Sequence, residues 1–465
     1  SQCAGIIAAD TNNGVGIAGI AGGDGPVDGV QLMISLGIGT GHQAGFEDQG
    51  LGLRPTRTDV CLVEHLSKQV PRRMRAPGTA VSYSNWATGL AGRIIENVEG
   101  KPFNDVIKER IFKPTGMTRS TFLHELPGEL APLMPESAVR ENGQWLSSGM
   151  PVIFGEAAAG RLRATGADMA KYMIMHLNEG EIDGRQVLSP GVAEGMREPT
   201  HRLAPGMPAM LFGWYEIPTQ GTFAYGHGGF LPSFGSRVVL LPELELGLYV
   251  TVIGEGAWSL GGMVQDAFLD WVIPAPKGPR PTVEPGHDYA PFVGHYRNLR
   301  RNFSRIERAD QLDPHSMGEL IIAEHPDGGL SVIKDSGSQR YVPLEGRERV
   351  FVSVDDQDDL LGFSGSGDEV AEFFQFSFPV YTYARVRLID RTGLHERIRM
   401  VGLVTLAGVL LGGLWLTRSW FGGNGTEKSA RAALFFSGVF YAAGLLGLAH
   451  FWDDEWVPTY SEGIP

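Results

Sequence analysis

A tyrosine and an asparagine separated by one residue form the first group in this sequence that could do chemistry. Tyr83-Ser84-Asn85 follows Pro77-Gly78-Thr79 and opens the first regular apolar helical pattern. At a loop–helix junction both side chains can line one side of a cleft, where the phenol can relay a proton and the amide can hold a polar group. Taken alone, the tripeptide is more typical of a buried tyrosine whose hydroxyl has a hydrogen-bond partner.

The second group combines a histidine with glycines. Gly226-His227-Gly228-Gly229-Phe230 ends a strand-like run. Glycines let another molecule approach the backbone closely, and a main-chain N–H at such an edge can point at a developing oxyanion. Taken alone, this segment is more typical of a tight corner between a strand and a turn, with His227 merely exposed.

Composition argues against several other kinds of site. The 465 residues include 39 Lys and Arg against 53 Asp and Glu, a net charge of −14, which disfavours nucleic-acid partners. The two cysteines, Cys3 and Cys61, allow at most one disulfide, and Cys61 has the surroundings of a small buried residue. The histidines lack metal-binding spacings such as His-x-His, so neither a metal nor a cofactor is expected.

Helices come first among the elements that must position these groups. Apolar residues recur every four positions and predict one helix, ended by Gly100 and Pro102: Trp86, Leu90, Ile94 and Val98, flanked by Ala87, Ala91 and Ile95. A second, short helix carries four inward apolar residues: Phe103, Val106, Ile107 and Ile111. A third starts at Thr165, has Asp168 at the capping-box distance, and buries one side: Met169, Tyr172, Met173 and Leu177.

Strand-like runs with short connections follow these helices. They are Phe212–Ile217, Thr222–His227, Arg237–Leu241 and Leu248–Ile253. Short connections suit antiparallel pairing, so the fold class is α+β, an antiparallel sheet with helices, in a domain over residues 40–272. A glycine-rich irregular leader over residues 1–39 precedes that domain.

Composition changes again after residue 272. A proline-rich linker is predicted over residues 273–285. Residues 286–392 contain further strand-like runs, typical of a small all-β domain, either barrel or sandwich: Leu320–Ala323, Leu330–Ile333, Arg349–Val354 and Val380–Val386.

Two long apolar segments occupy the last region, residues 393–465. Residues 400–417 and 432–449 each lack charged residues and as helices would each span about 27 Å. Tryptophans near their ends suit a membrane interface, so we predict a transmembrane helical hairpin with membrane lipid as a partner. The alternative is a buried helical hairpin in a soluble domain. Basic residues flank both ends of the hairpin, so charge does not fix its orientation.

Taken together and in this order, the motifs are much more specific than each one alone. Five stretches carry the resemblance: Pro77-Gly78-Thr79 with Tyr83-Ser84-Asn85, Gly89 to Glu96, Phe112 to Thr118, Gly160 to Ala170, and His227-Gly228-Gly229. In these residues the chain resembles the serine β-lactamase-related and penicillin-binding-protein-like family. That family includes class C β-lactamases, D-alanyl-D-alanine carboxypeptidases and esterases. His42-Gln43-Ala44-Gly45-Phe46 is similar to a degraded form of its His-Thr-Ser-Gly segment.

The resemblance implies a β-lactamase/transpeptidase-like fold and a role for each motif residue. Tyr83 would assist proton transfer, and Asn85 would hydrogen-bond the nucleophile's neighbours or the substrate amide. His227 would stand where many members have lysine and help to bind substrate. Gly228 and Gly229 would form the substrate-binding edge, and the N–H of Phe230 would be half of an oxyanion hole.

The family's first motif, Ser-x-x-Lys, is missing before Tyr83. The one match in the chain, Ser331 to Lys334, lies in the β-rich region, where the two side chains would face opposite sides of a strand. We interpret it as chance. The expected nucleophile would fall just before Ser1, so the chain is expected to be an N-terminally truncated fragment; the alternative is a decayed enzyme.

The sequence therefore predicts a membrane-anchored serine hydrolase acting on a small-molecule or peptide-like ester or amide through an acyl-enzyme, inactive in this chain because Ser-x-x-Lys is absent. By family analogy it would lie at a bacterial cytoplasmic membrane, with the hydrolase domain on the extracytoplasmic side. Two alternatives stay open: a non-catalytic ligand-binding or sensing module on a membrane anchor, and a purely structural membrane-associated protein. Protein partners are unknown.

Overall fold

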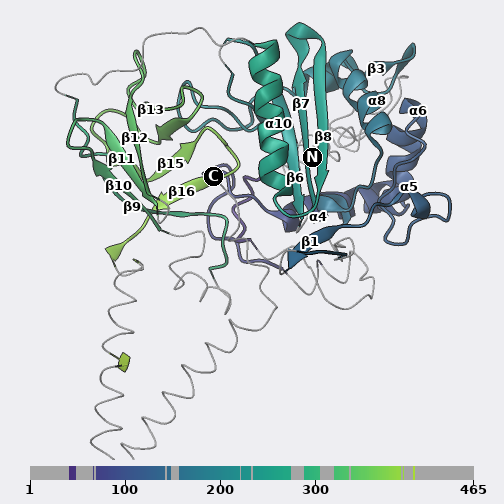
Figure 1. The fold of residues 1–465 in the computed structure, drawn as a ribbon, viewed down its shortest axis with the longest axis horizontal. Helices are drawn as coiled ribbons and strands as arrows, with labels where there is room; N and C mark the ends of the chain where they lie inside the picture. Colours follow the sequence, from purple (N-terminus) through teal and green to yellow (C-terminus); the bar gives the residue numbers. More distant parts are fainter. Residues whose placement is uncertain are drawn as a thin grey trace, which may run out of the picture. The chain divides into compact units, whose positions relative to one another are not determined.

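The computed structural model describes part of the chain. The described residues are 41–48, 66, 70–141, 144–147, 157–219, 221–231, 234–273, 287–303, 319–334, 337–388, 391 and 402–403. The chain divides into two compact units, and the first includes both Ser1–Arg308 and Leu320–Arg385. A helix-and-sheet part and a β barrel both belong to this first unit (Figure 1).

Helix α4 (Asn85–Glu99) follows the Tyr83 segment directly. Its N-cap is Ser84, whose Oγ accepts a hydrogen bond from the N–H of Ala87, and it ends at Gly100 in the left-handed conformation. The predicted helix is confirmed, but its predicted inward stripe is partly wrong. Val98 is 54% exposed, because the buried face is centred on the small residues Ala87 and Ala91 and on Ile95.

The next two predicted helices are also present. The second is built from α5 (Phe103–Ile107), a π-helical turn (Lys108–Phe112) and α6 (Lys113–Thr115), and all four of its predicted inward residues are buried. Helix α8 (Gly166–Leu177) has Thr165 as its N-cap, and the Thr165 side chain accepts from the N–H of Asp168. The Asp168 carboxylate does not complete a capping box, because it accepts from the Arg119 N–H and the Ser120 hydroxyl instead.

Smaller elements connect these helices to the sheet. They are the 3-10 turn Ala131–Leu133, the β1–β2 hairpin (Ala138–Glu141 and Gln144–Ser147), α7 (Ala157–Gly160), the β3–β4 hairpin (Glu181–Ile182 and Arg185–Gln186) and α9 (Pro190–Gly195).

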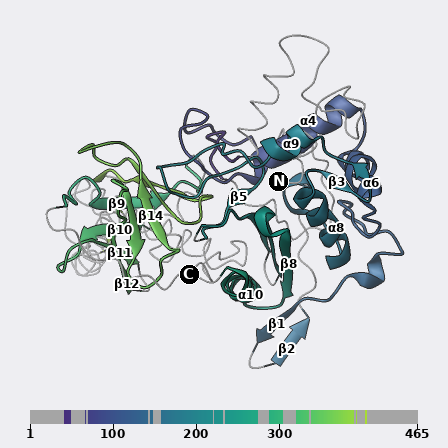
Figure 2. The same ribbon diagram turned by 90° about the horizontal axis from the view of Figure 1, so that it is seen from above.

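The main sheet has four antiparallel strands in the order β5–β6–β7–β8. Their bounds are β5 (Tyr215–Glu216), β6 (Tyr225–Leu231), β7 (Phe234–Leu241) and β8 (Leu246–Ile253). Helix α10 (Ala257–Val272), which the sequence did not predict, covers one face of this sheet, and α8 covers the other (Figures 1 and 2). Alternate residues of β7 accordingly enter two apolar clusters, Val238 with the α8 side and Val239 with the α10 side.

The all-β region forms a closed barrel of eight antiparallel strands, which decides between the barrel and the sandwich. The strands follow one another around it, and β16 pairs with β9 to close the ring. They are β9 (Gly294–Asn298), β10 (Glu319–Glu324), β11 (Leu330–Lys334), β12 (Gly337–Pro343), β13 (Val350–Ser353), β14 (Leu360–Phe363), β15 (Phe373–Phe376) and β16 (Thr382–Arg385). Aromatic side chains fill its core, including Tyr296, Phe351, Phe363 and Phe374.

The described residues contain no helix with both the length and the apolar character needed to cross a bilayer. The predicted hairpin over residues 400–417 and 432–449 lies outside them except for 402–403, as do the leader, both cysteines and nearly all of the linker. The predicted domain boundaries stay predictions.

Candidate active site

The segment 41–48 lies along the loop that leads into α4. The carbonyl of Gly45 accepts from the N–H groups of Met74 and Arg75, and the carbonyl of His42 accepts from the Ser82 N–H at 2.7 Å. Gly45 has φ +74°, and a Cβ there would lie 2.3 Å from the Arg75 carbonyl oxygen. Only glycine allows this close approach, so the segment is held against the Tyr83 loop by backbone geometry.

His42 lies directly against Tyr83. Their ring centroids are 3.8 Å apart in a stacked arrangement, and the N–H of Ser84 donates to His42 Nδ1 at 3.2 Å. Because Nδ1 accepts, the neutral ring carries its proton on Nε2. Burial lowers the pKa of His42 well below its usual range, and the charge of His227 lowers it further. His42 is therefore neutral at pH 7.

The His227 segment lies at the open edge of the sheet. Strand β5 pairs with β6 only at Tyr225 and Gly226, and no other described strand pairs with this side of residues 227–231. Main-chain groups at an unpaired edge are available to a ligand. His227 is half-buried, and desolvation lowers its pKa well below its usual range, so its ring is also neutral at pH 7.

Tyr215 connects the His227 edge with Tyr83. Its ring lies 5.4 Å from that of His227, and its hydroxyl hydrogen-bonds the Gly228 backbone. Burial raises the pKa of Tyr215, and the neighbouring Tyr83 raises it further. A Cβ on Gly228 would lie 2.9 Å from the Trp258 ring and 3.4 Å from the Tyr215 hydroxyl, so the absence of a side chain lets Trp258 and Tyr215 pack closely against this strand.

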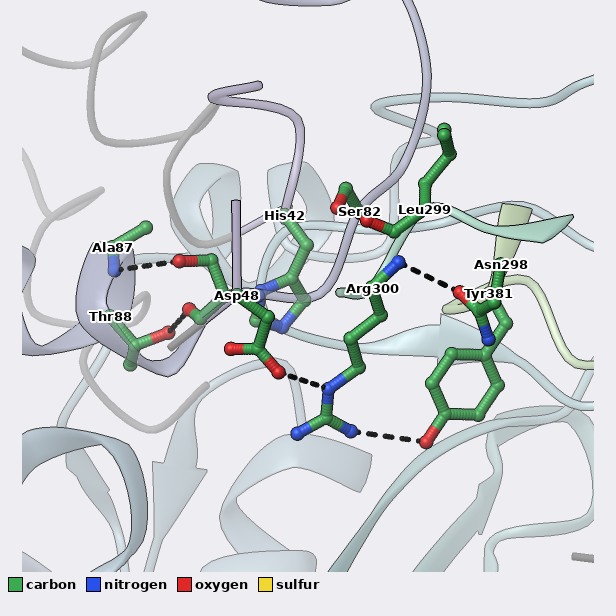
Figure 3. Close-up of polar contacts among 10 residues, drawn as sticks. His42, Asp48, Ser82, Ala87, Thr88, Asn298, Leu299, Arg300 and Tyr381 are labelled. Carbon is green, nitrogen blue, oxygen red and sulfur yellow. Dashed lines mark hydrogen bonds and ion pairs between the residues drawn. The ribbon is translucent and has the colours of Figure 1, made fainter. Parts of the chain in front are cut away.

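The barrel also contributes to this site. Arg300, just after β9, donates from Nε to Asp48 Oδ2 at 2.8 Å and from Nη1 to the Tyr381 hydroxyl at 3.1 Å (Figure 3). Its Cζ lies 4.5 Å from the centroid of the Tyr83 ring. The site therefore combines three phenols, two neutral imidazoles, an open strand edge and a guanidinium paired with a carboxylate.

Residues 41–257 match the family model described as Beta-lactamase. This part of the chain is similar to the β-lactamase family, and we call the matched residues the β-lactamase-family domain. It is 27% identical over 241 residues to "Penicillin-binding protein 4" of Amycolatopsis lactamdurans, a match covering 47% of this chain and 60% of that protein. It is also 27% identical over 194 residues to the Escherichia coli K12 "D-alanyl-D-alanine-carboxypeptidase/endopeptidase AmpH", covering 38% and 46%. The chain thus spans about half the length of these relatives.

Solved structures support the fold of the β-lactamase-family domain together with the barrel. The structure titled "Crystal structure of SurE" superposes with a TM-score of 0.52 at 19% identity, covering 83% of this chain and 85% of that chain. This likeness concerns the fold alone. The predicted β-lactamase/transpeptidase-like fold is confirmed.

The structure brings some of the predicted site residues of the β-lactamase-family domain together and leaves others apart. Tyr83 and His227 meet through His42 and Tyr215. Asn85 is buried in the first turn of α4, whereas Gly229 and Phe230 are exposed on β6. Ser331 and Lys334 lie on β11 of the barrel. No group of three or more metal-ligating side chains occurs in the described part of the chain.

Sequence reasoning missed four residues of this site: Asp48, Tyr215, Arg300 and Tyr381. Tyr215 had a weak signal, because it lies in the predicted strand Phe212–Ile217 that precedes the His227 strand. Arg300 and Tyr381 had none, since they belong to a different predicted domain and reach the site only through the packing of the barrel.

Proposed function

We propose that this chain is the larger part of a serine hydrolase that forms an acyl-enzyme with an amide or ester substrate. The observation that carries the proposal is the meeting of Tyr83 with the unpaired β6 edge through His42 and Tyr215. A proton-relaying phenol beside an open strand edge is an arrangement that suits acyl transfer. The match of residues 41–257 to the β-lactamase family model supports the same chemistry.

Each residue then has a stated role. Tyr83 carries the proton to and from the nucleophile, and Asn85 orients the nucleophile's neighbours or the substrate amide. The N–H of Phe230 supplies half of the oxyanion hole at the open edge, where Gly228 and Gly229 admit the substrate. His227 is neutral at pH 7 and offers a hydrogen bond rather than a fixed positive charge. A neutral group binds a β-lactam carboxylate weakly, which favours ester or peptide substrates over β-lactams.

The nucleophile is proposed to come from residues upstream of Ser1, since no Ser-x-x-Lys precedes Tyr83 in the sequence. Membrane anchoring through residues 400–417 and 432–449, with the hydrolase domain on the extracytoplasmic side of a bacterial cytoplasmic membrane, belongs to the same proposal. The second candidate function is a ligand-binding or sensing module that uses the same site without turnover.

The test compares the 465-residue chain with a version extended upstream through the genomic Ser-x-x-Lys. We expect labelling by a fluorescent penicillin or hydrolysis of a nitrophenyl ester only in the extended protein. Tyr83→Phe should then lower the rate by about 10²–10⁴-fold. Tyr225→Phe is the matched control, because the buried Tyr225 hydroxyl has no hydrogen-bond partner. An extended protein without either activity would favour the sensing module.

A further inference from the structure

Arg300 is held in place at three points. Its backbone N–H donates to Asn298 Oδ1 at 2.8 Å, Nε pairs with Asp48 and Nη1 donates to Tyr381 (Figure 3). The Arg300 and Asp48 side chains are only 14% and 15% exposed. A planar guanidinium fixed in this way has little rotamer freedom left, so its position relative to the catalytic part is well defined.

The loop that carries Arg300 is itself attached to the catalytic segment. The Ser82 hydroxyl donates to the Leu299 carbonyl at 3.1 Å, and the N–H of Asp48 donates to the Arg301 carbonyl. Glu47 accepts from the N–H of Phe303 through one oxygen and from the N–H of Arg72 through the other. Tyr83 therefore lies between two residues, Ser82 and Ser84, that are fixed by the barrel loop and by His42 respectively.

We propose that Arg300 of the barrel is a positioning residue that holds the Tyr83 ring in place for proton transfer. This inference rests on the proposed function. A guanidinium 4.5 Å from a tyrosine ring centroid attracts that ring, and the His42 ring packs against the same phenol. General acid–base catalysis requires the hydroxyl within hydrogen-bond reach of the nucleophile, so a loosened ring loses rate without losing substrate affinity.

The positive charge of Arg300 has a second effect in the same place. Together with burial and His227, it lowers the pKa of His42. A neutral His42 keeps Nδ1 as the acceptor for the Ser84 N–H, which fixes the residue that follows Tyr83. Because burial is the largest cause, Arg300 only adds to this effect, and its main contact with Tyr83 is through the ring.

The experiment uses the upstream-extended protein with Arg300→Gln, Arg300→Lys and, as a matched barrel control, Arg340→Gln. Arg340 bonds the carbonyls of Asp327 and Gly328 in a turn of the barrel. We expect Arg300→Gln to lower kcat by about 10²-fold with little change in KM, Arg300→Lys to recover part of it, and Arg340→Gln to leave it unchanged. In Tyr83→Phe, the further change Arg300→Gln should have little effect, because Arg300 acts through Tyr83.

Other outcomes overturn the positioning role. One such outcome is that Arg300→Gln lowers kcat equally in the wild-type and Tyr83→Phe backgrounds, and another is that it raises KM alone. Either result would indicate that the guanidinium contacts the substrate and does not position Tyr83. If the extended protein shows no activity, the proposed function fails separately. The 465-residue chain then still tests the contact by ¹³C-tyrosine NMR, with the Tyr83 signal assigned through Tyr83→Phe. The Tyr83 signal should shift or broaden in Arg300→Gln and stay as in wild type in Arg340→Gln. A Tyr83 signal that is unchanged in both variants would overturn the inference.

Discussion

His42 and His227 show how burial sets the chemistry of single residues in this site. Both rings are neutral at pH 7, since desolvation lowers both pKa values. Arg300 contacts the Tyr83 ring, and its Nε is already paired with Asp48. Under the proposed function, the described residues would take part in proton transfer through hydroxyl groups and neutral imidazoles.

A third buried histidine, His176 on α8, predicts acid sensitivity. It packs between Tyr172 and Trp214, and its Nε2 has no hydrogen-bond partner. Burial, assisted by the charge of Arg197, lowers its pKa to about 3. Below pH 6.5, His176 binds a proton in the unfolded chain but not in the folded protein. The free energy of unfolding therefore falls as the pH falls towards 3.

Wild type should lose unfolding free energy as the pH falls from 6.5 to 5, at about 1.4 kcal/mol for each pH unit from His176 alone. We therefore expect the loss over this interval to be smaller in His176→Phe, by about 2 kcal/mol. Denaturant unfolding at the two pH values measures it. His325→Gln, in a turn of the barrel, is the control. Parallel pH slopes in wild type and His176→Phe would show that His176 is not the sensor.

At the scale of elements, the pairing of β6 with β7 depends on Gly226. A Cβ there would lie 2.1 Å from the Val238 carbonyl oxygen and 2.7 Å from Ile217 Cδ1. Gly226→Ala should cost about 2–3 kcal/mol of unfolding free energy, because the strands must separate. Gly229→Ala on the same strand meets only the Ser236 hydroxyl, at 3.1 Å, and serves as the control in urea unfolding. Equal stabilities would contradict this prediction.

The elements also show what the sequence can and cannot reveal. The Thr165 cap and the inward residues of α5 were predictable, because capping and periodicity are local properties. The inward face of α4 was predicted only in part, since close packing there uses small residues such as Ala91 rather than the largest apolar ones. Helix α10 was not predicted, because it has few charged residues and its glycines, such as Gly261, disguise the helical pattern.

At the scale of the whole first unit, the β-lactamase-family domain and the barrel share apolar clusters. Met207, 1% exposed, packs with Ala204 and with Val350 of β13, and its side chain fills the space where Gly362 of β14 lacks a Cβ. A second cluster joins Ala80 with Leu299 and Phe373. Because they share these clusters, we expect the two parts to unfold together.

Met207→Ala should therefore destabilise both parts at once, by about 2–4 kcal/mol, within a single calorimetric transition. Met263→Ala on α10 is the control, because that side chain is 67% exposed. Two separate transitions, with the β-lactamase-family domain unaffected, would show that the parts fold independently.

The arrangement of these parts was beyond sequence reasoning. The ion pair between Asp48 and Arg300 joins residues 252 positions apart, and no local pattern marks either partner. The two regions were predicted separately from their own periodicities, whereas their shared site follows only from tertiary packing.

The loop that follows β9 contacts Ser82 and the segment 41–48 largely through its main chain. Ser82, Asp48 and Glu47 bond the carbonyls of Leu299 and Arg301 and the N–H of Phe303. These main-chain contacts do not themselves depend on the side chains at those three loop positions, although Leu299 is also buried beside Ala80 and Phe373. Arg300 is different, since its own guanidinium makes the contacts, so homologues that share this barrel should retain an arginine there.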